Sequence, residues 1–373
     1  MKVALVHDHL TQDGGAERVL RVLSSMFPDA PIYCLAHNKD KFKASDEMEI
    51  RTSFLEKPPF SLVKFEWLLP FMPAATEHHD LREFDLVISS SSAMAKGVIP
   101  GTNAQHICYL HTPTRYLWTD MHDYVANLQV PGVVKKVLPH YLSYLRQWDK
   151  MAADRVNVFI ANSKTVSERI QTFYQKDSVV IYPPVDTHEF SVSDAPKTYF
   201  LAGGRITNYK KFDLVVDAFN RVGLPIKIFG SGPFLQELKE RAKGNIEFLG
   251  RVTDEHKAQL YKDCVAYLNP QEEDFGITAV EAMACGRPVI AYGKGGTTET
   301  VIEGKTGTLF NEQTWEGLAD AVIRFKHEEF DPNEIRTFAE SFSHDRFKKQ
   351  MRFVIDKVYE RGNRHKEPEQ HNA

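Results

Sequence analysis

The stretch LNPQEEDFGITAVEAMACGRPVIAYGKGGTTET, residues 268–300, decides the fold of this chain. Residues 265–268 form an apolar run that predicts a buried strand, and a proline and an acidic loop follow it. Apolar residues at helical spacing predict a helix over 277–285, which Gly286 terminates as the residue after the cap. The apolar run 289–292 predicts the next strand. The order strand, loop, helix, strand is typical of a parallel α/β sheet.

Two carboxylates stand out in this stretch. Glu273 lies in the loop at the carboxyl end of the first strand, and Glu281 lies about one turn into the helix. Between them Phe275, Gly276 and Ile277 open the helix with unpaired backbone N–H groups, which attract anions. A loop acid, an amide cradle and a helix acid suit a ligand with hydroxyls on both sides of a diphosphate, such as a nucleotide sugar. The alternative is a pair of surface acids that flank a turn.

The spacing of these acids carries a family resemblance. Glu273 and Glu281 bracket seven residues, and the run EDFGITAVEAMACGRPVIA resembles the E-x7-E motif of retaining glycosyltransferases of family 4. The resemblance implies an α/β GT-B fold, with two Rossmann-like parallel-sheet domains that face a central cleft. Residues 1–190 would form the acceptor-binding domain and 191–343 the nucleotide-sugar-binding domain. A last helix at about 344–361 would cross back to the first domain.

Length and composition agree with two globular domains. The chain has 373 residues, 42% of them hydrophobic and 26% charged, with a net charge of −4, so nothing in the overall charge favours nucleic-acid binding. The four cysteines are far apart in apolar contexts, which predicts buried thiols rather than a zinc site. No apolar run approaches the ~20 residues that span a bilayer, and the start is too short for a signal-peptide core. We therefore expect a cytoplasmic protein, which could also bind peripherally to the inner face of the plasma membrane.

In the first half, ligand-binding candidates follow predicted strands. Gly14 and Gly15 lie between a strand at 3–6 and a helix from Ala16, where they would let a phosphate approach the backbone. His111 follows the strand at 105–110, at the strand edge where open α/β sheets bind ligands. The resemblance implies that Gly14 and Gly15 contact the donor diphosphate. It also implies that His111 lies near the reacting end of the donor sugar and the acceptor.

Two further candidates come from the run after His111. Arg115 is a candidate ligand for an acceptor phosphate, and Tyr116 is its neighbour. The run His7-Asp8-His9 could suggest a metal, but strand alternation sends neighbours to opposite faces, so we expect no metal there.

In the second half, two cations flank a predicted strand–helix turn. Arg205 follows the strand at 199–202 and Lys210 precedes a helix, so both would face one diphosphate. The resemblance assigns this pair to the leaving diphosphate, and Lys211 could share the role. It also assigns the backbone at Arg251 and Val252 to the base.

Two stretches carry unusual apolar residues. Residues 54–75 combine aromatic side chains with four prolines, which rule out one long helix, and residues 133–155 combine basic residues with aromatics on a helix. Each could pack on its domain, or could contact anionic lipid or a lipid-linked acceptor. We place Met151 on the packed face of the second stretch, and the linker between the domains at 186–197.

The function predicted from the sequence is retaining transfer of a sugar from a nucleotide diphosphate to a lipid-linked saccharide in polysaccharide or O-antigen biosynthesis. The runs LHTPTRYLW and GGAERVL resemble a subgroup that builds bacterial surface polysaccharide, which favours GDP-mannose as donor. With His111, Arg205, Lys210 and Glu273 as catalytic residues and no Asp-x-Asp motif, we expect no cofactor and no metal. The alternatives are another donor, such as a UDP-sugar, and a non-catalytic nucleotide-sugar-binding protein.

Overall fold

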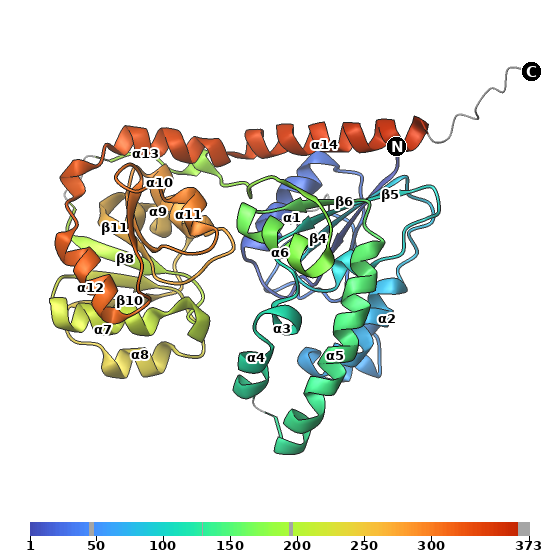
Figure 1. The fold of residues 1–373 in the computed structure, drawn as a ribbon, viewed down its shortest axis with the longest axis horizontal. Helices are drawn as coiled ribbons and strands as arrows, with labels where there is room; N and C mark the ends of the chain where they lie inside the picture. The colour runs from blue at the N-terminus through green and yellow to red at the C-terminus, as the bar shows by residue number, and fades with distance from the viewer. Residues whose placement is uncertain (45–47, 129, 194–196, 365–373) are drawn as a thin grey trace, which may run out of the picture. The chain divides into compact units, whose positions relative to one another are not determined.

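The computed structural model describes residues 1–44, 48–128, 130–193 and 197–364 (Figure 1). The chain divides into two compact units. Unit 1 comprises Met1–Ile181 and Lys348–Ala373, and unit 2 comprises Tyr182–Phe347. Each unit has its own parallel sheet and its own apolar core.

Among the described residues, the sheet of unit 1 has seven strands in the order β3-β2-β1-β4-β5-β6-β7, all parallel. The strands are β1 (Val3–His7), β2 (Ile32–Cys34), β3 (Ile50–Thr52), β4 (Leu86–Ser91), β5 (Gln105–Leu110), β6 (Val158–Ala161) and β7 (Ser178–Val180). The first six strands along the chain have the Rossmann order, which changes direction between β1 and β4.

The helices of unit 1 are α1 (Gly15–Met26), α2 (Met72–Glu77), α3 (Arg115–Trp118), α4 (Met121–Asn127), α5 (Gly132–Asp154) and α6 (Lys164–Tyr174). The described part of unit 1 also contains four short 3-10 helices: η1 (Phe54–Glu56), η2 (Phe60–Leu62), η3 (Phe65–Phe71) and η4 (Ala95–Gly97). As expected, the prolines of 54–75 break that stretch into short turns.

The described part of unit 2 forms a six-stranded parallel sheet in the order β10-β9-β8-β11-β12-β13, which is again the Rossmann order. Its strands are β8 (Tyr199–Gly203), β9 (Ile226–Phe229), β10 (Ile246–Gly250), β11 (Cys264–Asn269), β12 (Val289–Tyr292) and β13 (Gly307–Phe310). The predicted α/β class with two Rossmann-like sheets is confirmed.

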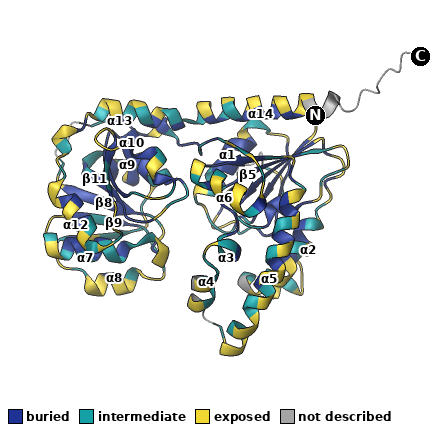
Figure 2. Cartoon of the chain, in the orientation of Figure 1, coloured by how far each residue is buried: buried dark blue, intermediate teal, exposed yellow. Residues whose placement is uncertain are grey.

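Helices cover both faces of the second sheet. They are α7 (Phe212–Val222), α8 (Leu235–Arg241), α9 (Asp254–Asp263), α10 (Ile277–Ala284), α11 (Thr297–Thr300), α12 (Trp315–Arg324) and α13 (Pro332–Ala339), with η5 (Thr187–Glu189), η6 (Asn208–Lys210), η7 (His327–Glu329) and η8 (Glu340–Phe342). Alternate residues of one strand enter different cores: Leu201 packs with α9, α10 and α13, and Ala202 packs with α7, α8 and α12. Both sheets are buried between helices whose outer sides are exposed (Figure 2).

The last helix, α14 (His344–Arg364), begins in unit 2 and continues into unit 1. Its expected apolar face is buried, because each of the five predicted residues is at most 8% exposed: Phe347, Met351, Val354, Ile355 and Val358.

The domain boundary differs from the prediction. We placed it between 190 and 191 with a linker over 186–197, whereas the two units meet between Ile181 and Tyr182. The reason is that Val185 and Phe190 are buried in the core of unit 2, although the sequence around them is polar and aperiodic. Residues 194–196 of the predicted linker lie outside the described residues.

Helix α5 also corrects one assignment. Leu142, Leu145 and Trp148 are buried as expected, but Met151 is 58% exposed. Met151 lies on the opposite side of the helix, in line with the exposed residues Val137 and Tyr144.

Candidate functional site

The predicted cations of unit 2 and Glu273 lie in the connections that follow the carboxyl ends of its strands. The strand order reverses between β8 and β11, and ligands of open α/β sheets bind at such a switch point. Arg205 and Lys210 follow β8, and Glu273 follows β11. The Tyr267 hydroxyl of β11 donates a hydrogen bond of 2.8 Å to the carbonyl of Gly203, which ties the two strands together at this point.

Glycines set the shape of these loops. Gly230 has φ +120°, and a Cβ there would lie 1.8 Å from the carbonyl oxygen of Gly204. A Cβ on Gly232 would lie 2.0 Å from the carbonyl oxygen of Ile206. The loops after β8 and β9 therefore stack backbone on backbone, and the Gly-x-Gly of 230–232 is explained by this close approach.

Lys210 and Glu273 form an ion pair at the switch point. Gln271 Nε2 also donates to Glu273 Oε1 over 2.7 Å, and the amide of Gly296 donates to the Glu273 carbonyl over 2.7 Å. Burial alone would lower the pKa of Lys210, but the negative charge of Glu273 outweighs it and raises that pKa. Lys210 is therefore a fixed cation at neutral pH.

Arg205 and Arg251 are exposed at the same edge of the sheet. Arg251 Nε donates to Ser231 Oγ over 2.8 Å, so the loops after β9 and β10 are also joined. Val252 is half-buried against the core of unit 2. Lys211 has a left-handed backbone (φ +54°) at the cap of α7, an uncommon conformation for a residue other than glycine.

The helix start between the two acids is as predicted. Gly276 caps α10 with φ +90°, Phe275 is buried, and Ile277 begins the helix. At the other end, the amides of Gly286 and Arg287 donate to the carbonyls of Met283 and Ala282, which is the expected glycine-terminated end of a helix.

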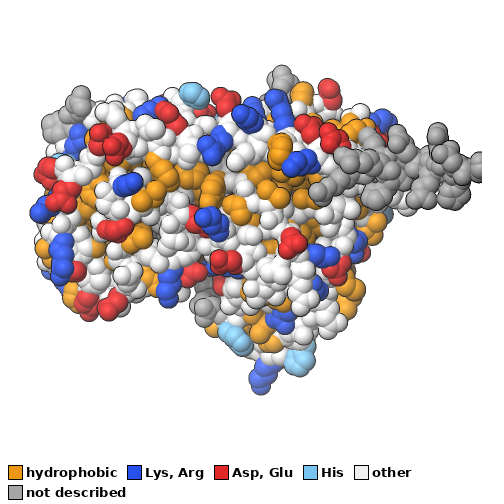
Figure 3. All heavy atoms as spheres, turned by 45° about the horizontal axis from the view of Figure 1, so that its top comes forward, with side chains coloured by type: hydrophobic (Ala, Val, Ile, Leu, Met, Phe, Trp, Pro, Cys, Tyr) orange, Lys and Arg blue, Asp and Glu red, His pale blue; other side chains and the backbone are white. Residues whose placement is uncertain are grey.

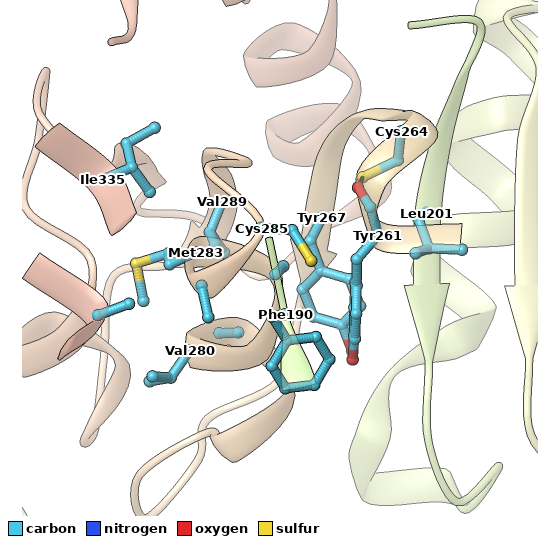
Figure 4. Close-up of a cluster of buried hydrophobic side chains, with 14 of the residues drawn as sticks. Phe190, Leu201, Tyr261, Cys264, Tyr267, Val280, Met283, Cys285, Val289 and Ile335 are labelled. Carbon is cyan, nitrogen blue, oxygen red and sulfur yellow. Dashed lines mark hydrogen bonds between the residues drawn. The ribbon is translucent and has the colours of Figure 1, made fainter. Parts of the chain in front are cut away.

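Glu281 has partners that the sequence did not reveal. Its side chain is 1% exposed, and it accepts hydrogen bonds from Lys257 Nζ (3.2 Å) and from the Tyr261 hydroxyl (2.9 Å). Tyr261 belongs to the apolar cluster of unit 2, with Tyr267 and Met283 (Figure 4). The ribose contact predicted for Glu281 stays a prediction, and it requires a ligand to share this buried carboxylate with Lys257.

In unit 1 the predicted residues lie beside the switch point between β1 and β4. Gly14 is the N-cap of α1, and Gly15 begins that helix. The Gly14 amide donates to Glu17 Oε2 over 2.9 Å, so the first turn is closed by a capping-box contact. His111 follows β5, and its Nε2 lies 2.9 Å from Ser90 Oγ. Burial lowers the pKa of His111 to about 4, so its ring is neutral at pH 7.

His7 and Asp8 have different partners, as strand alternation predicts. His7 Nδ1 lies 3.2 Å from Ser90 Oγ, whereas Asp8 accepts the backbone amides of Ser92 (2.6 Å), Ala93 (3.0 Å) and Ala95 (2.7 Å). Within the described ranges no group of three or more His, Cys, Asp or Glu could hold a metal ion.

Arg115 and Tyr116 belong to α3, which a buried ion pair positions. Lys96 Nζ pairs with Asp149 Oδ1 at 2.5 Å, and both side chains are at most 1% exposed. Asp149 also accepts from Thr114 Oγ1, Trp118 Nε1 and the Tyr174 hydroxyl. Arg115 Nε donates to Asp120 over 2.8 Å, and Tyr116 packs against Tyr124.

The two stretches with unusual apolar residues both lie in unit 1. Leu55, Leu68 and Met72 are buried, whereas Leu62 is 83% and Trp67 50% exposed. The Tyr141 hydroxyl of α5 donates to the Leu69 carbonyl over 3.3 Å, so the stretches touch. No helix in the described part of the chain is long and apolar enough to cross a membrane. Acidic and basic side chains are interspersed over the face drawn in Figure 3.

Family models match both halves of the chain. Residues 13–189 match the model described as Glycosyltransferase Family 4, and residues 185–342 match the model described as Glycosyl transferases group 1. The two matches together cover residues 13–342, so each half of the chain is similar to one domain of glycosyltransferases of the family 4 type.

Individual relatives share about a quarter of their aligned residues with this chain. The chain is 26% identical over 258 residues to the α-1,3/1,6-mannosyltransferase ALG2 of Dictyostelium discoideum, a match that covers 56% of this chain and 59% of that protein. It is 27% identical over 235 residues to the O-antigen chain mannosyltransferase C of Escherichia coli, with 57% and 62% covered. The match thus spans about three-fifths of the length of these curated relatives.

Solved structures share the whole fold. The crystal structure of HepE of Anabaena in complex with UDP superimposes with a TM-score of 0.72, over 96% of this chain and 100% of that one. At 18% identity this likeness shows the common GT-B fold.

Proposed function

We propose that this chain is a retaining glycosyltransferase that moves a sugar from a nucleotide diphosphate to a hydroxyl group of a lipid-linked saccharide. The observation that carries the proposal is the switch point of unit 2, where Lys210 is a fixed cation beside Glu273 and Arg205 is exposed on the same loop. The matches to glycosyltransferase domains over residues 13–342 support it.

In the proposed reaction, the bond between the anomeric carbon and the diphosphate oxygen breaks, and its electron pair goes to the diphosphate. The acceptor oxygen bonds to the same face of the anomeric carbon, and its proton goes to the leaving phosphate oxygen. The barrier is the separation of charge, so fixed cations and amides placed where the negative charge develops lower it. Arg205 and Lys210 would fill this role together with the amides of the helix start at Gly276, whereas the Gly14 amide already donates to Glu17.

The remaining residues would each bind a different part of the donor or the acceptor. Glu273 would hold sugar hydroxyls, the backbone at Arg251 and Val252 would meet the base, and Glu281 would meet the ribose. His111 would position the anomeric end or the incoming alcohol. We propose that no metal takes part, because Arg205 and Lys210 supply the positive charge that a divalent cation would otherwise provide.

Mannose from GDP-mannose is the donor that we propose first. Two of the relatives are named as mannosyltransferases, and one acts in O-antigen chains by its name. The alternative is a UDP-sugar, which the UDP complex of HepE favours. The experiment is a panel of GDP- and UDP-sugars, scored by thermal shift and by donor hydrolysis in EDTA. Strict dependence on Mg²⁺ or Mn²⁺ would overturn the metal-free assignment.

His111 separates an enzyme from a non-catalytic nucleotide-sugar-binding protein. We expect His111→Ala to bind the nucleotide as the wild type does and to lose transfer. Unchanged transfer would remove His111 from the reaction.

A lipid-linked acceptor would bring unit 1 to an anionic membrane on the cytoplasmic side. Leu62 and Trp67 are exposed, as are Val137 and Tyr144 of α5, and the exposed Lys64 and Lys136 are near them in the sequence. Exposed apolar and basic side chains of this kind suit contact with anionic lipid. We expect co-sedimentation with phosphatidylglycerol vesicles that falls for Trp67→Glu. Equal recovery with phosphatidylcholine alone would contradict an electrostatic contribution.

A further inference from the structure

Four side chains of unit 1 stand in a line that ends at His111. Glu17 Oε1 lies 3.6 Å from His7 Nε2, His7 Nδ1 lies 3.2 Å from Ser90 Oγ, and Ser90 Oγ lies 2.9 Å from His111 Nε2. His7, Glu17 and Ser90 are at most 3% exposed. We call these four residues the histidine line.

The sheet register fixes the middle of the histidine line. His7 of β1 and Ser90 of β4 are direct partners in the parallel pairing, so their side chains lie on the same face of the sheet. Tyr109, the partner of Ser90 on β5, packs edge-on against the ring of His111. The geometry therefore depends on the strand pairing rather than on mobile side chains.

Helix α1 fixes the other end. Glu17 accepts the Gly14 amide at Oε2 and Gln12 Nε2 at Oε1, over 2.9 and 3.1 Å. Burial by itself would raise the pKa of Glu17, but its interaction with His7, followed by its other hydrogen bonds, outweighs burial and holds that pKa at about 2. Glu17 is thus a carboxylate at neutral pH, which can only accept hydrogen bonds from its neighbours.

The carboxylate of Asp8 also lies near His111, but backbone amides already donate hydrogen bonds to it. Asp8, at the end of β1, is close enough to act on the charge of His111, and the three donating amides belong to the loop after β4. Ser90 is therefore the partner through which neighbouring side chains set the proton on His111.

The direction of each hydrogen bond follows from the carboxylate. A negative charge beside His7 Nε2 favours a proton on that nitrogen, and when the ring carries only that proton, its Nδ1 is an acceptor. Ser90 then donates its hydroxyl proton to His7 Nδ1, and its oxygen accepts from the remaining neighbour, His111 Nε2–H. In that arrangement His111 Nδ1 carries the lone pair.

We propose that His7 carries a single proton, on Nε2, and that Glu17, acting through His7 and Ser90, fixes His111 in the Nε2–H tautomer, so that its Nδ1 accepts a hydrogen bond from a hydroxyl group of the substrate. This inference rests on the proposed function for the identity of that substrate. Glu17, His7 and Ser90 are positioning residues, because none of them needs to touch the sugar. A charged His7 would donate from both nitrogens, reverse Ser90 and place the proton of His111 on Nδ1.

The direct test reads the tautomer by nitrogen-15 NMR of the unliganded full chain at pH 7.5. The His111 resonance is assigned from its loss in His111→Gln. We expect a protonated Nε2 and an unprotonated Nδ1. A proton on Nδ1 would overturn the proposal, and because no sugar is present, this result is independent of whether the chain is a transferase.

Variants then test the coupling. Ser90→Ala should mix the two tautomers and lower kcat/KM at least tenfold with unchanged nucleotide affinity, and Ser90→Thr should restore both. The matched control is Ser89→Ala, which removes a buried serine–histidine contact of 2.8 Å to His106 on the opposite face of β4. Glu17→Gln, which keeps the shape but removes the charge, should mix the tautomers as well. An unchanged tautomer in both Ser90→Ala and Glu17→Gln would overturn the proposal, whereas failure of every donor alone would overturn only the proposed function.

Discussion

The two switch points of this molecule have the same strand order and hold their functional groups in different ways. In unit 2 the loops stack backbone on backbone, with glycines at 230 and 232 where no Cβ would fit. In unit 1 buried side chains from distant parts of the chain hold one another, as in the histidine line and in the pair of Lys96 and Asp149.

This difference decides what a local sequence motif can reveal. A backbone-built site needs particular residues at short spacing, so glycines, cations and acids mark it in the sequence. A side-chain network depends on which strands and helices become neighbours, and a single sequence does not show this.

The largest expected effect comes from breaking the buried network of unit 1. Asp149→Ala leaves Lys96 uncompensated, so the free energy of unfolding of unit 1 should fall by about 3–5 kcal/mol. Urea unfolding measures the change.

The matched control is Asp154→Ala on the same helix. Asp154 pairs with Lys176 at 3.1 Å and is 53% exposed, so its loss should cost less than about 1 kcal/mol. Equal effects of the two variants would contradict the account of unit 1.

A second substitution tests the stacked loops of unit 2. Gly230→Ala places a Cβ against the Gly204 carbonyl at a φ of +120°, and the strained φ alone should cost about 1–3 kcal/mol. Nucleotide affinity should fall with stability, because the loop of Arg205 must move. Gly244→Ala is the control, since a Cβ there meets nothing within 4 Å. An unchanged nucleotide affinity in Gly230→Ala would show that nucleotide binding does not depend on the stacked loops.

The smallest effect concerns acid sensitivity. Burial lowers the pKa of His106 to about 3 in the folded chain. The unfolded chain takes up this proton near pH 6.5, so the stabilisation is complete above that pH and is lost as the pH falls toward 3. Between pH 7 and 5.5 the contribution of one histidine is about 1 kcal/mol.

His106→Leu should therefore reduce the loss of unfolding free energy over that interval by about the same amount. Urea titrations at the two pH values measure it. The same pH dependence in the variant as in the wild type would mean that His106 does not carry this proton.

Much of the fold follows from the sequence. Uninterrupted apolar runs predict buried parallel strands, and apolar residues at helical spacing predict helices such as α7, whose face of Phe212, Val215, Val216 and Phe219 is buried. The boundary near 181 could not be read, because the burial of Val185 and Phe190 in unit 2 depends on tertiary packing rather than on local pattern.

The candidate site follows the same division. The sequence marks Lys210 and Glu273, and the structure brings them into contact. The sequence does not indicate that Lys257 pairs with Glu281, because a lysine on a polar helix is ordinarily solvated. The sequence could have predicted the contact of Glu17 with the start of α1, because Glu17 lies at the capping-box position three residues after Gly14. Its link to Ser90 through His7 depends on the pairing of β1 with β4.

We propose that the diphosphate of a nucleotide sugar binds at the switch point of unit 2. A crystal structure with a bound nucleoside diphosphate tests it most directly. We expect phosphate density within hydrogen-bonding distance of Arg205 and Lys210 and near the helix start at Gly276. A nucleotide bound elsewhere, with these groups unengaged, would contradict it.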